Sequence, residues 1–203
     1  MGTEMPQQTQ GPCAECGCEY VWGLKSDERR HNKYHDRAVN GYKTRQPDGC
    51  HFVTHRSEMA LQLLAQAAAS EAHYETEYDF TSFSAEKTEH DEHETIAAIY
   101  VKGGRVCALI VSRKRECHWK ARLQDIAEHR PNAEAIQTHK RRAVDMIWVL
   151  KNCRRQGIAK RIVRAMAEHC KVSVEDLAHL TPLSTDAINL WHSLRLTTIY
   201  LAH

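Results

Sequence analysis

The chain has 203 residues, of which 42% are hydrophobic and 27% are charged, and this composition excludes wholesale disorder. Its apolar runs are far shorter than the roughly 18 residues of a membrane-spanning helix, so we expect no membrane association. The 28 basic residues nearly balance the 26 acidic ones, and this near-neutral charge does not by itself predict nucleic-acid binding.

Eight cysteines are present, three of them between positions 13 and 18, and the N-terminus lacks the apolar core of a secretory signal. This pattern favours a reducing compartment and makes the clustered cysteines candidate metal ligands.

In chain order, residues 1–12 are polar and without periodicity, and we expect a flexible tail. Residues 13–45 hold clustered Cys and His with almost no aliphatic side chains, so hydrophobic burial alone cannot fold them. Residues 46–203 are expected to form a second, larger domain with its own core. Its first elements are a turn at Pro47-Asp-Gly, a short strand from Cys50, and a helix capped by Ser57 that runs to about His73.

The rest of the larger domain alternates β-rich and helical patterns. Two runs of β-forming residues flank a Gly-Gly turn, which predicts a hairpin. The polar stretch after it predicts a connection containing one short helix. The expected elements are strands at 96–101 and 106–111, a polar connection at 112–142 with a helix at 119–129, a strand at 144–150, a helix from about 156, a helix at 187–194 and a strand at 196–201.

Four residues in the N-terminal segment have the spacing of zinc ligands. Cys13 and Cys16 form a Cys-x-x-Cys knuckle, and His31 and His35 follow, four residues apart and therefore on one face of a helix. Two thiolates and two imidazoles can complete a closed tetrahedron, so the expected metal is structural Zn²⁺. Cys18 lies on the other side of the knuckle and is not expected to be a ligand.

A second pattern joins a buried strand to a basic, glycine-bearing turn and a helix. The run from Ile147 to Lys160 contains a turn of the form Arg-x-x-Gly-x-Ala, in which Gly157 permits close approach of the backbone to a ligand. The free N–H groups at the helix start, with the charges of Arg154, Arg155 and Lys160, suit a pyrophosphate.

This turn resembles the acetyl-CoA loop of GNAT N-acetyltransferases. The Ile147-Trp-Val strand and its Arg-Arg-x-x-Ile-Ala turn are similar to those of ESCO-type cohesin acetyltransferases. The segment Cys13-Ala-Glu-Cys-Gly-Cys-Glu-Tyr20, the acidic pair Asp27-Glu28 and the His31/His35 pair resemble the finger of the same family. The expected fold is therefore α/β (α+β), with a two-Cys, two-His zinc finger followed by a GNAT-like mixed, mostly antiparallel sheet with flanking helices.

The resemblance implies an acetyl-CoA-dependent protein-lysine N-acetyltransferase that acts in the nucleus. Its acceptor would be a lysine on the head of a cohesin SMC subunit, acetylated to establish sister-chromatid cohesion, with chromatin-associated proteins as further partners. The resemblance implies that acetyl-CoA is bound by the strand residues Ile147, Trp148 and Val149, by the turn residues Arg155, Gln156, Gly157, Ile158, Ala159 and Lys160, and by Pro182 and Leu183 near the catalytic position Thr181.

The catalytic acid of this chain departs from the family pattern. ESCO-type enzymes generally carry a Ser-Asp pair before the Pro of the C-terminal motif, where this chain has Leu180 and Thr181. Strand alternation would place Asp145 on one face with Ile147 and Val149, so we consider Asp145 as a replacement proton acceptor. The alternative is a solvent-facing acid at the strand end.

Three functions remain open. The first is the cohesin acetyltransferase, the second is an acetyltransferase with a different acceptor, and the third is a catalytically weak or silent GNAT-fold adaptor on chromatin, suggested by Leu180 and Thr181. A sequence-specific DNA-binding zinc-finger protein is disfavoured, and direct DNA binding is expected to be weak or absent. One finger in a chain of near-neutral net charge can contact few phosphates.

Overall fold

The computed structural model describes residues 10–76, 83–85, 94–128 and 133–202. In chain order its elements are β1 (Gln10–Pro12), β2 (Glu19–Val21), α1 (Lys25–Asn40), β3 (Tyr42–Lys43), β4 (Gly49–Val53), α2 (Met59–Thr76), β5 (Ile96–Lys102), β6 (Arg105–Arg122), α3 (Leu123–Ala127), β7 (Ala133–Val149), η1 (Lys151–Cys153), α4 (Ile158–His169), η2 (Val174–Asp176), β8 (Ala178–Leu180), α5 (Thr185–Ser193) and β9 (Thr198–Ala202).

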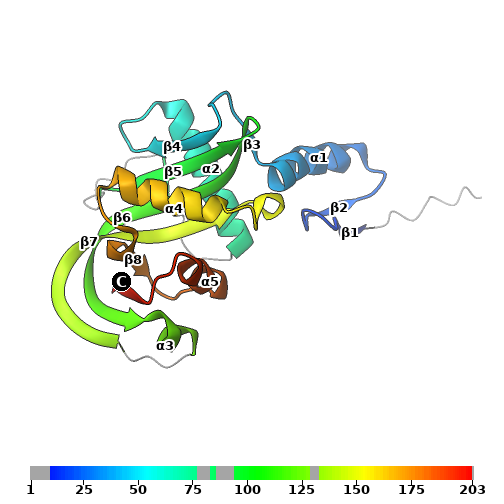
Figure 1. Ribbon diagram of the computed structural model, residues 1–203. Coiled ribbons are helices and arrows are strands. Elements are labelled where there is room, and N and C mark those ends of the chain that lie inside the picture. The colour runs from blue at the N-terminus through cyan, green and yellow to red at the C-terminus, as the bar shows by residue number, and fades with distance from the viewer. Residues whose placement is uncertain (1–9, 77–82, 86–93, 129–132, 203) are drawn as a thin grey trace, which may run out of the picture.

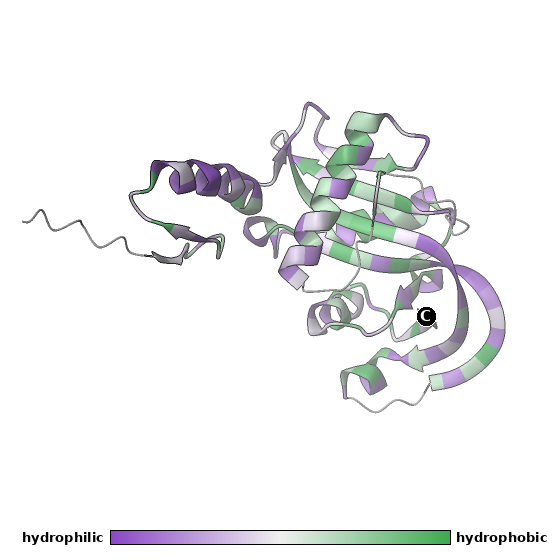
Figure 2. Ribbon diagram, turned by 180° about the vertical axis from the view of Figure 1, so that it is seen from behind, coloured by the Kyte–Doolittle hydropathy of each residue, from purple (hydrophilic) through white to green (hydrophobic). Residues whose placement is uncertain are grey.

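The N-terminal segment forms a small unit that projects from the body of the molecule (Figure 1). Strands β1 and β2 pair antiparallel, and α1 follows them. Residues 10–12, assigned to a tail from the sequence, form β1, and residues 1–9 lie outside the described part. Helix α1 is hydrophilic almost throughout (Figure 2) and buries one side chain, His31. Hydrophobic packing therefore contributes little to this unit.

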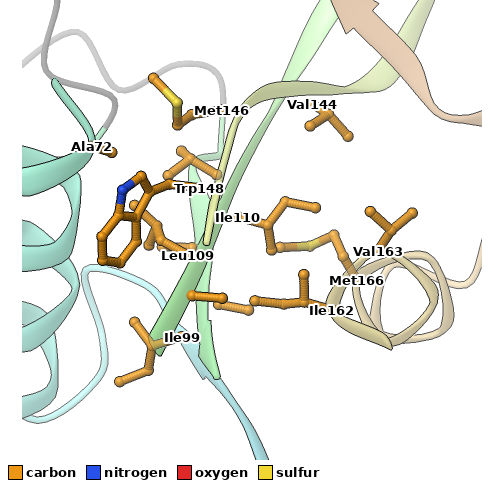
Figure 3. Packing of buried hydrophobic residues seen from close by; sticks show 14 of the residues in the cluster. Ala72, Ile99, Leu109, Ile110, Val144, Met146, Trp148, Ile162, Val163 and Met166 are labelled. Carbon is orange, nitrogen blue, oxygen red and sulfur yellow. The ribbon is translucent and has the colours of Figure 1, made fainter. Parts of the chain in front are cut away.

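The body is built on a mixed sheet with the strand order β4-β5-β6-β7-β8-β9, to which β3 adds by pairing with β6. The pairs are antiparallel except β7–β8 and β8–β9, which are parallel. Helix α2 covers one face and α4 the other. Figure 3 shows Trp148 and Met146 directed toward α2, and Ile110, Ile162 and Met166 packed on the α4 side. The predicted fold, a finger followed by a mostly antiparallel sheet with flanking helices, is confirmed.

The distal half of the sheet closes on itself. Strand β6 pairs with β7 along its length and with β9 at its end, while β8 joins β7 to β9. Each of the four strands contributes one fully buried small residue to a second cluster, namely Cys117, Ala143, Ala178 and Ala202. Larger side chains at these positions would hold the four strands apart, because protein interiors are close-packed.

The prediction of a polar connection at 112–142 was wrong. Strand β6 continues to Arg122 and β7 begins at Ala133, and the expected helix at 119–129 shrinks to α3. From position 113 to 116, residues of β6 alternate between partly buried and exposed, but the partly buried ones are Arg113 and Arg115. Because charged residues occupy inward positions, the alternation was hidden in the sequence.

Smaller differences concern helix ends. Helix α2 begins at Met59 and ends at Thr76, three residues beyond the predicted end. The hydroxyl of Ser57 accepts a hydrogen bond from the Thr54 N–H at 3.0 Å instead of capping α2. Helix α4 begins at Ile158, and Ser184 caps α5 by accepting from the Ala187 N–H. Within the described residues, no helix is both long and apolar enough to cross a membrane.

Candidate functional site

The four predicted metal ligands lie together between the β1–β2 hairpin and α1. One ligand atom from each of Cys13, Cys16, His31 and His35 lies within 4.8 Å of the others. The Sγ atom of Cys13 is 3.4 Å from Nδ1 of His35, and the Sγ atom of Cys16 is 3.4 Å from Nε2 of His31. These separations match neighbouring ligands around one tetrahedral ion, whose bonds to S and N are about 2.3 and 2.0 Å long.

Neighbouring side chains fix both imidazole rings. The Nε2 atom of His35 is 3.1 Å from the carboxylate of Glu15, which lies between the two cysteines. The ring of Tyr20 stacks on His31 with centroids 3.8 Å apart and an interplanar angle of 6°. A carboxylate on the non-ligating nitrogen orients a metal-bound histidine and strengthens it as a ligand.

The thiols differ in proton affinity. Backbone hydrogen bonds from Cys16 and Glu15 lower the pKa of Cys13 to about 6, whereas burial raises the pKa of Cys16. Metal binding needs both as thiolates, and the donor set of two sulfurs and two imidazole nitrogens fits structural Zn²⁺. Cys18 is not part of the cluster within the described residues, as its position in the sequence predicted.

The finger is joined to the body at the end of α1. Arg105 of β6 forms an ion pair with Asp36 at 3.0 Å and donates to the backbone oxygen of Gly41 at 3.0 Å. Gly41 has φ +81°, and a Cβ atom there would lie 2.1 Å from the carbonyl oxygen of Val106. This position therefore requires glycine, both for its conformation and for the approach to β6.

The predicted donor strand β7 is free along one edge near its end. It pairs with β8 at two positions, Ala143 with Ala178 and Val144 with His179, whereas its pairing with β6 continues to Val149. Beyond Val144, alternate residues therefore direct N–H and C=O groups to an edge that no described strand occupies. Ile147, Trp148 and Val149 lie on this segment, and the fork between β7 and β8 can accept an extended ligand.

The predicted pyrophosphate turn follows directly. Gly157 precedes α4 in a left-handed conformation with φ +76°, and Arg155 has φ +60°. No described residue accepts a hydrogen bond from the backbone N–H groups of residues 156–160. The structure therefore places Gln156, Gly157, Ile158, Ala159 and Lys160 around a set of free donors at a helix start, which is an arrangement suited to an anion.

The side chains of this turn are partly committed elsewhere. Gln156 accepts a hydrogen bond from Nζ of Lys102 at 2.6 Å and donates to the backbone oxygen of Asn152. Arg154 forms an ion pair with Glu75 of α2. Among the described residues, Arg155 and Lys160 have no ion-pair partner, so their charges are available to a ligand.

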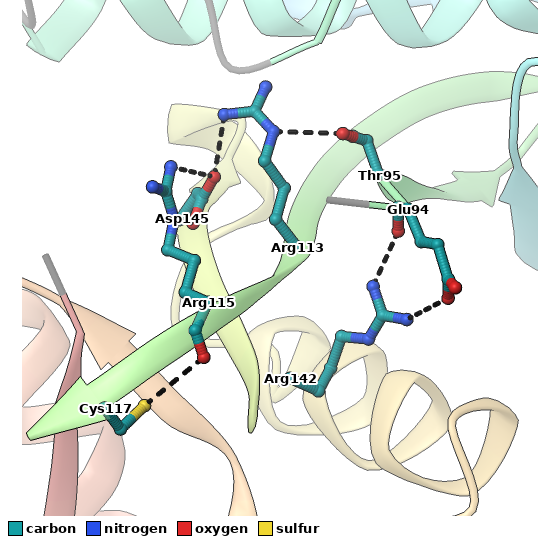
Figure 4. Close-up of polar contacts among 7 residues, drawn as sticks. All are labelled: Glu94, Thr95, Arg113, Arg115, Cys117, Arg142 and Asp145. Carbon is teal, nitrogen blue, oxygen red and sulfur yellow. Dashed lines mark hydrogen bonds and ion pairs between the residues drawn. The ribbon is translucent and has the colours of Figure 1, made fainter. Parts of the chain in front are cut away.

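Asp145 differs from both sequence-based expectations. Its side chain has no exposed surface, so it is not a solvent-facing acid. One oxygen accepts from Nε of Arg115 at 2.9 Å, and the other accepts from Arg113 at 2.8 Å and Arg115 at 3.0 Å (Figure 4). The carboxylate is therefore clamped by two guanidinium groups on the α2 side of the sheet.

A bulge explains why the predicted face was wrong. Val111 pairs with Met146 but Ser112 pairs with Val144, which leaves Asp145 as the extra residue of β7. The bulge turns Asp145 away from the face of Ile147 and Val149, because one inserted residue breaks the two-residue alternation. The two-residue alternation of side chains between the faces of β7 therefore applies from Met146 onward but does not extend to Asp145.

Thr181, Pro182 and Leu183 follow β8 at the far side of the fork, and the bond before Pro182 is cis. Sequence reasoning missed Glu75, Arg113 and Arg115, which hold the strand and turn through long-range contacts that no local pattern announces. It also missed His179, which is buried beside Trp191 with the two ring centroids 4.2 Å apart. Burial lowers the pKa of His179 to about 3. Trp191 is a core residue, with 1% of its surface exposed.

Comparisons with known proteins agree with this geometry. The family model described as "Acetyltransferase (GNAT) family" matches residues 59–194, about two thirds of the chain, and the model described as "zinc-finger of acetyl-transferase ESCO" matches residues 2–37. No curated protein matches the sequence significantly.

Among solved structures, the xEco2 acetyltransferase domain bound to a lysine–CoA conjugate is similar, with a TM-score of 0.59 and 14% identity over 79% of this chain and 96% of that one. A second structure, of the xEco2 acetyltransferase domain, matches with a TM-score of 0.58 and 14% identity over 79% of this chain and 94% of that one. At this identity, the likeness establishes the fold.

Proposed function

We propose that this chain, which belongs to the GNAT acetyltransferase family and carries an ESCO-type finger, transfers the acetyl group of acetyl-CoA to a lysine side chain of a protein. The observation that carries the proposal is the free edge of β7 beside a turn whose backbone N–H groups have no acceptor within the described chain. A thioester on a long diphosphate-bearing arm fits this combination of an extended fork and an anion site.

In the proposed mechanism, the chain supplies alignment and polarisation. The N–H groups of the turn at 156–160, with Arg155 and Lys160, hold the pyrophosphate, and Pro182 and Leu183 border the fork from the β8 side. A backbone N–H at the free edge of Ile147–Val149 donates to the thioester carbonyl, whose oxygen gains negative charge when the amine attacks. The amide C–N bond forms, the thioester C–S bond breaks and CoA leaves as its thiol, while the proton of the lysine ammonium passes to solvent.

The acceptor lysine must lose a proton, because its ordinary pKa is about 10.4. Thr181 cannot act as a strong base, and both oxygens of Asp145 already accept hydrogen bonds from arginine. These contacts favour a positioning role for Asp145 over the role of proton acceptor. In the positioning role, Asp145 fixes the conformation of β7 at the bulge.

We further propose that the acceptor is a lysine on the head of a cohesin SMC subunit and that the protein acts in the nucleus, on chromatin. The support for this is the match of residues 2–37 to the finger of ESCO acetyltransferases, together with the fold shared with the xEco2 domain. The proposed finger metal is structural Zn²⁺, because four protein ligands leave no coordination position open.

The test is calorimetry with the purified, zinc-loaded chain and CoA, followed by acetylation assays. We expect saturable CoA binding, and transfer from acetyl-CoA to recombinant cohesin heads in preference to free lysine and unrelated proteins. Absence of CoA binding would refute the donor site. Transfer to other amines alone would refute the cohesin acceptor, and binding without any turnover would support a silent adaptor instead.

A further inference from the structure

Glu75, near the C-terminal end of α2, contacts both halves of the donor site. One oxygen of its carboxylate accepts a hydrogen bond from Nε1 of Trp148 at 2.7 Å. The other oxygen forms an ion pair with the guanidinium of Arg154. Trp148 belongs to the strand that borders the fork, and Arg154 is the first residue of the basic turn. A single side chain on α2 therefore connects strand and turn.

The contacts of Arg154 show how the connection works. Its Nε atom donates to the backbone oxygen of Val149 at 2.9 Å, while another nitrogen meets Glu75. The guanidinium is thus directed back to the end of β7 and to α2. In this arrangement Arg154 braces the turn from outside, and the phosphate-binding charges are left to Arg155 and Lys160.

The turn needs such a brace because its backbone is unfavourable on its own. Arg155 adopts φ +60°, which costs a non-glycine residue about 1 kcal/mol or more, and Gly157 adopts φ +76°. A second anchor lies on the opposite side, where Lys102 donates to the side chain of Gln156. The turn is therefore tied on both flanks, by α2 through Arg154 and by the β5–β6 hairpin through Gln156.

We propose that Glu75 is a positioning residue of the donor site: through Arg154 it holds the turn in the conformation that presents its N–H groups to the CoA pyrophosphate. The inference rests on the proposed function. It assigns to α2, which lies on the opposite side of the sheet from α4, a role in binding the donor.

The first experiment separates the diphosphate from the rest of CoA. The Kd of CoA is measured by calorimetry, and the inhibition constant of pantetheine, which lacks the diphosphate, by competition. Glu75→Gln keeps an acceptor for Trp148 but removes the charge opposite Arg154. We expect CoA to bind about fivefold more weakly, as befits a partly exposed ion pair, with pantetheine unchanged. Glu58→Gln, an exposed acid just before α2, is the matched control.

The second experiment uses a double-mutant cycle. Arg154→Gln removes the ion pair with Glu75 and also the hydrogen bond to the Val149 oxygen, so it should weaken CoA binding at least as much as Glu75→Gln. Adding Glu75→Gln to Arg154→Gln should weaken binding little further, because the ion pair is already lost. Phosphorus NMR of bound CoA should show a displaced pyrophosphate resonance in each. Glu58→Gln, the matched control, should leave that resonance in place.

The outcomes distinguish this inference from the proposed function. If the wild-type chain binds CoA and Glu75→Gln binds it equally well, the brace is refuted and the donor site stands. If Glu75→Gln weakens pantetheine and CoA alike, the residue acts on the whole fold, and the positioning role is refuted. If the wild-type chain binds no CoA, both proposals fall.

Discussion

The finger and the catalytic body are stabilised by different means. Helix α1 of the finger has 16 residues and buries one of them, His31, itself a candidate metal ligand. Helix α4 of the body has 12 residues and buries five, all apolar and packed on the sheet. The finger would therefore depend on the proposed metal ion, whereas the body depends on its core. Changes that affect one mechanism should leave the other intact.

The largest effect should follow from loss of the metal. Zn²⁺ removal by a chelator, or Cys13→Ser, should unfold residues 13–40, because a structural zinc supplies about 10–16 kcal/mol to a finger of this size. Hydrogen exchange should show loss of protection in α1 with β5–β7 still protected. Cys18→Ser is the matched control and should retain stoichiometric zinc. Loss of protection in the body would contradict the separation of the two units.

A smaller effect is expected at the junction between the units. Gly41→Ala would place a Cβ atom 2.1 Å from the Val106 oxygen at φ +81°, and we expect a loss of about 3 kcal/mol in the free energy of unfolding. Gly11→Ala is the control, because a Cβ there meets nothing within 4 Å. Chemical denaturation measures both. Equal stability of the two variants would show that the contact between α1 and β6 is dispensable.

The next effect concerns the buried ion pairs of Asp145 with Arg113 and Arg115 inside the body. Asp145→Asn leaves Arg113 and Arg115 without their shared carboxylate. We expect the free energy of unfolding to fall by about 2 kcal/mol, because the two guanidinium charges then lack their partner. The exposed Asp186→Asn is the control and should change stability little. Zinc content should not change.

The same variant tests the role of Asp145 in turnover. Measured with CoA binding intact, turnover close to that of the wild type would refute Asp145 as proton acceptor. A large loss of turnover, with a shifted pH profile, would contradict the positioning role that the clamp favours.

The smallest effect concerns Glu71, on the side of α2 that faces the finger. Burial raises the pKa of this carboxyl above its ordinary value, so its charged form is disfavoured in the folded protein. The folded state then holds a proton that the unfolded state releases, and stability falls as pH rises through the interval between the two pKa values. Glu71→Gln should stabilise the chain at neutral pH and abolish this pH dependence. Thermal unfolding at several pH values measures it, and a less stable variant would contradict the expectation.

Much of the fold could be predicted from patterns that are local. The hairpin around Gly103-Gly104, the strand before the basic turn and the amphipathic helix after it all have short-range signals, and each is present. The long arms of β6 and β7 could not be predicted, because arginines occupy their inward positions and find their partner 30 or more residues away. The bulge at Asp145 has no local signature either.

The sequence by itself determined the four candidate metal ligands and the glycine-bearing turn before α4, because both depend on residue types at fixed short spacings. A knuckle, a histidine pair one helical turn apart and a glycine before a helix carry their geometry with them. The tertiary structure alone decided which charges remain available. In the folded protein Asp145 is buried between two guanidinium groups, and Arg154 forms an ion pair with Glu75. Ion pairs between distant segments form only when the sheet and α2 bring them together, so no local pattern can specify them.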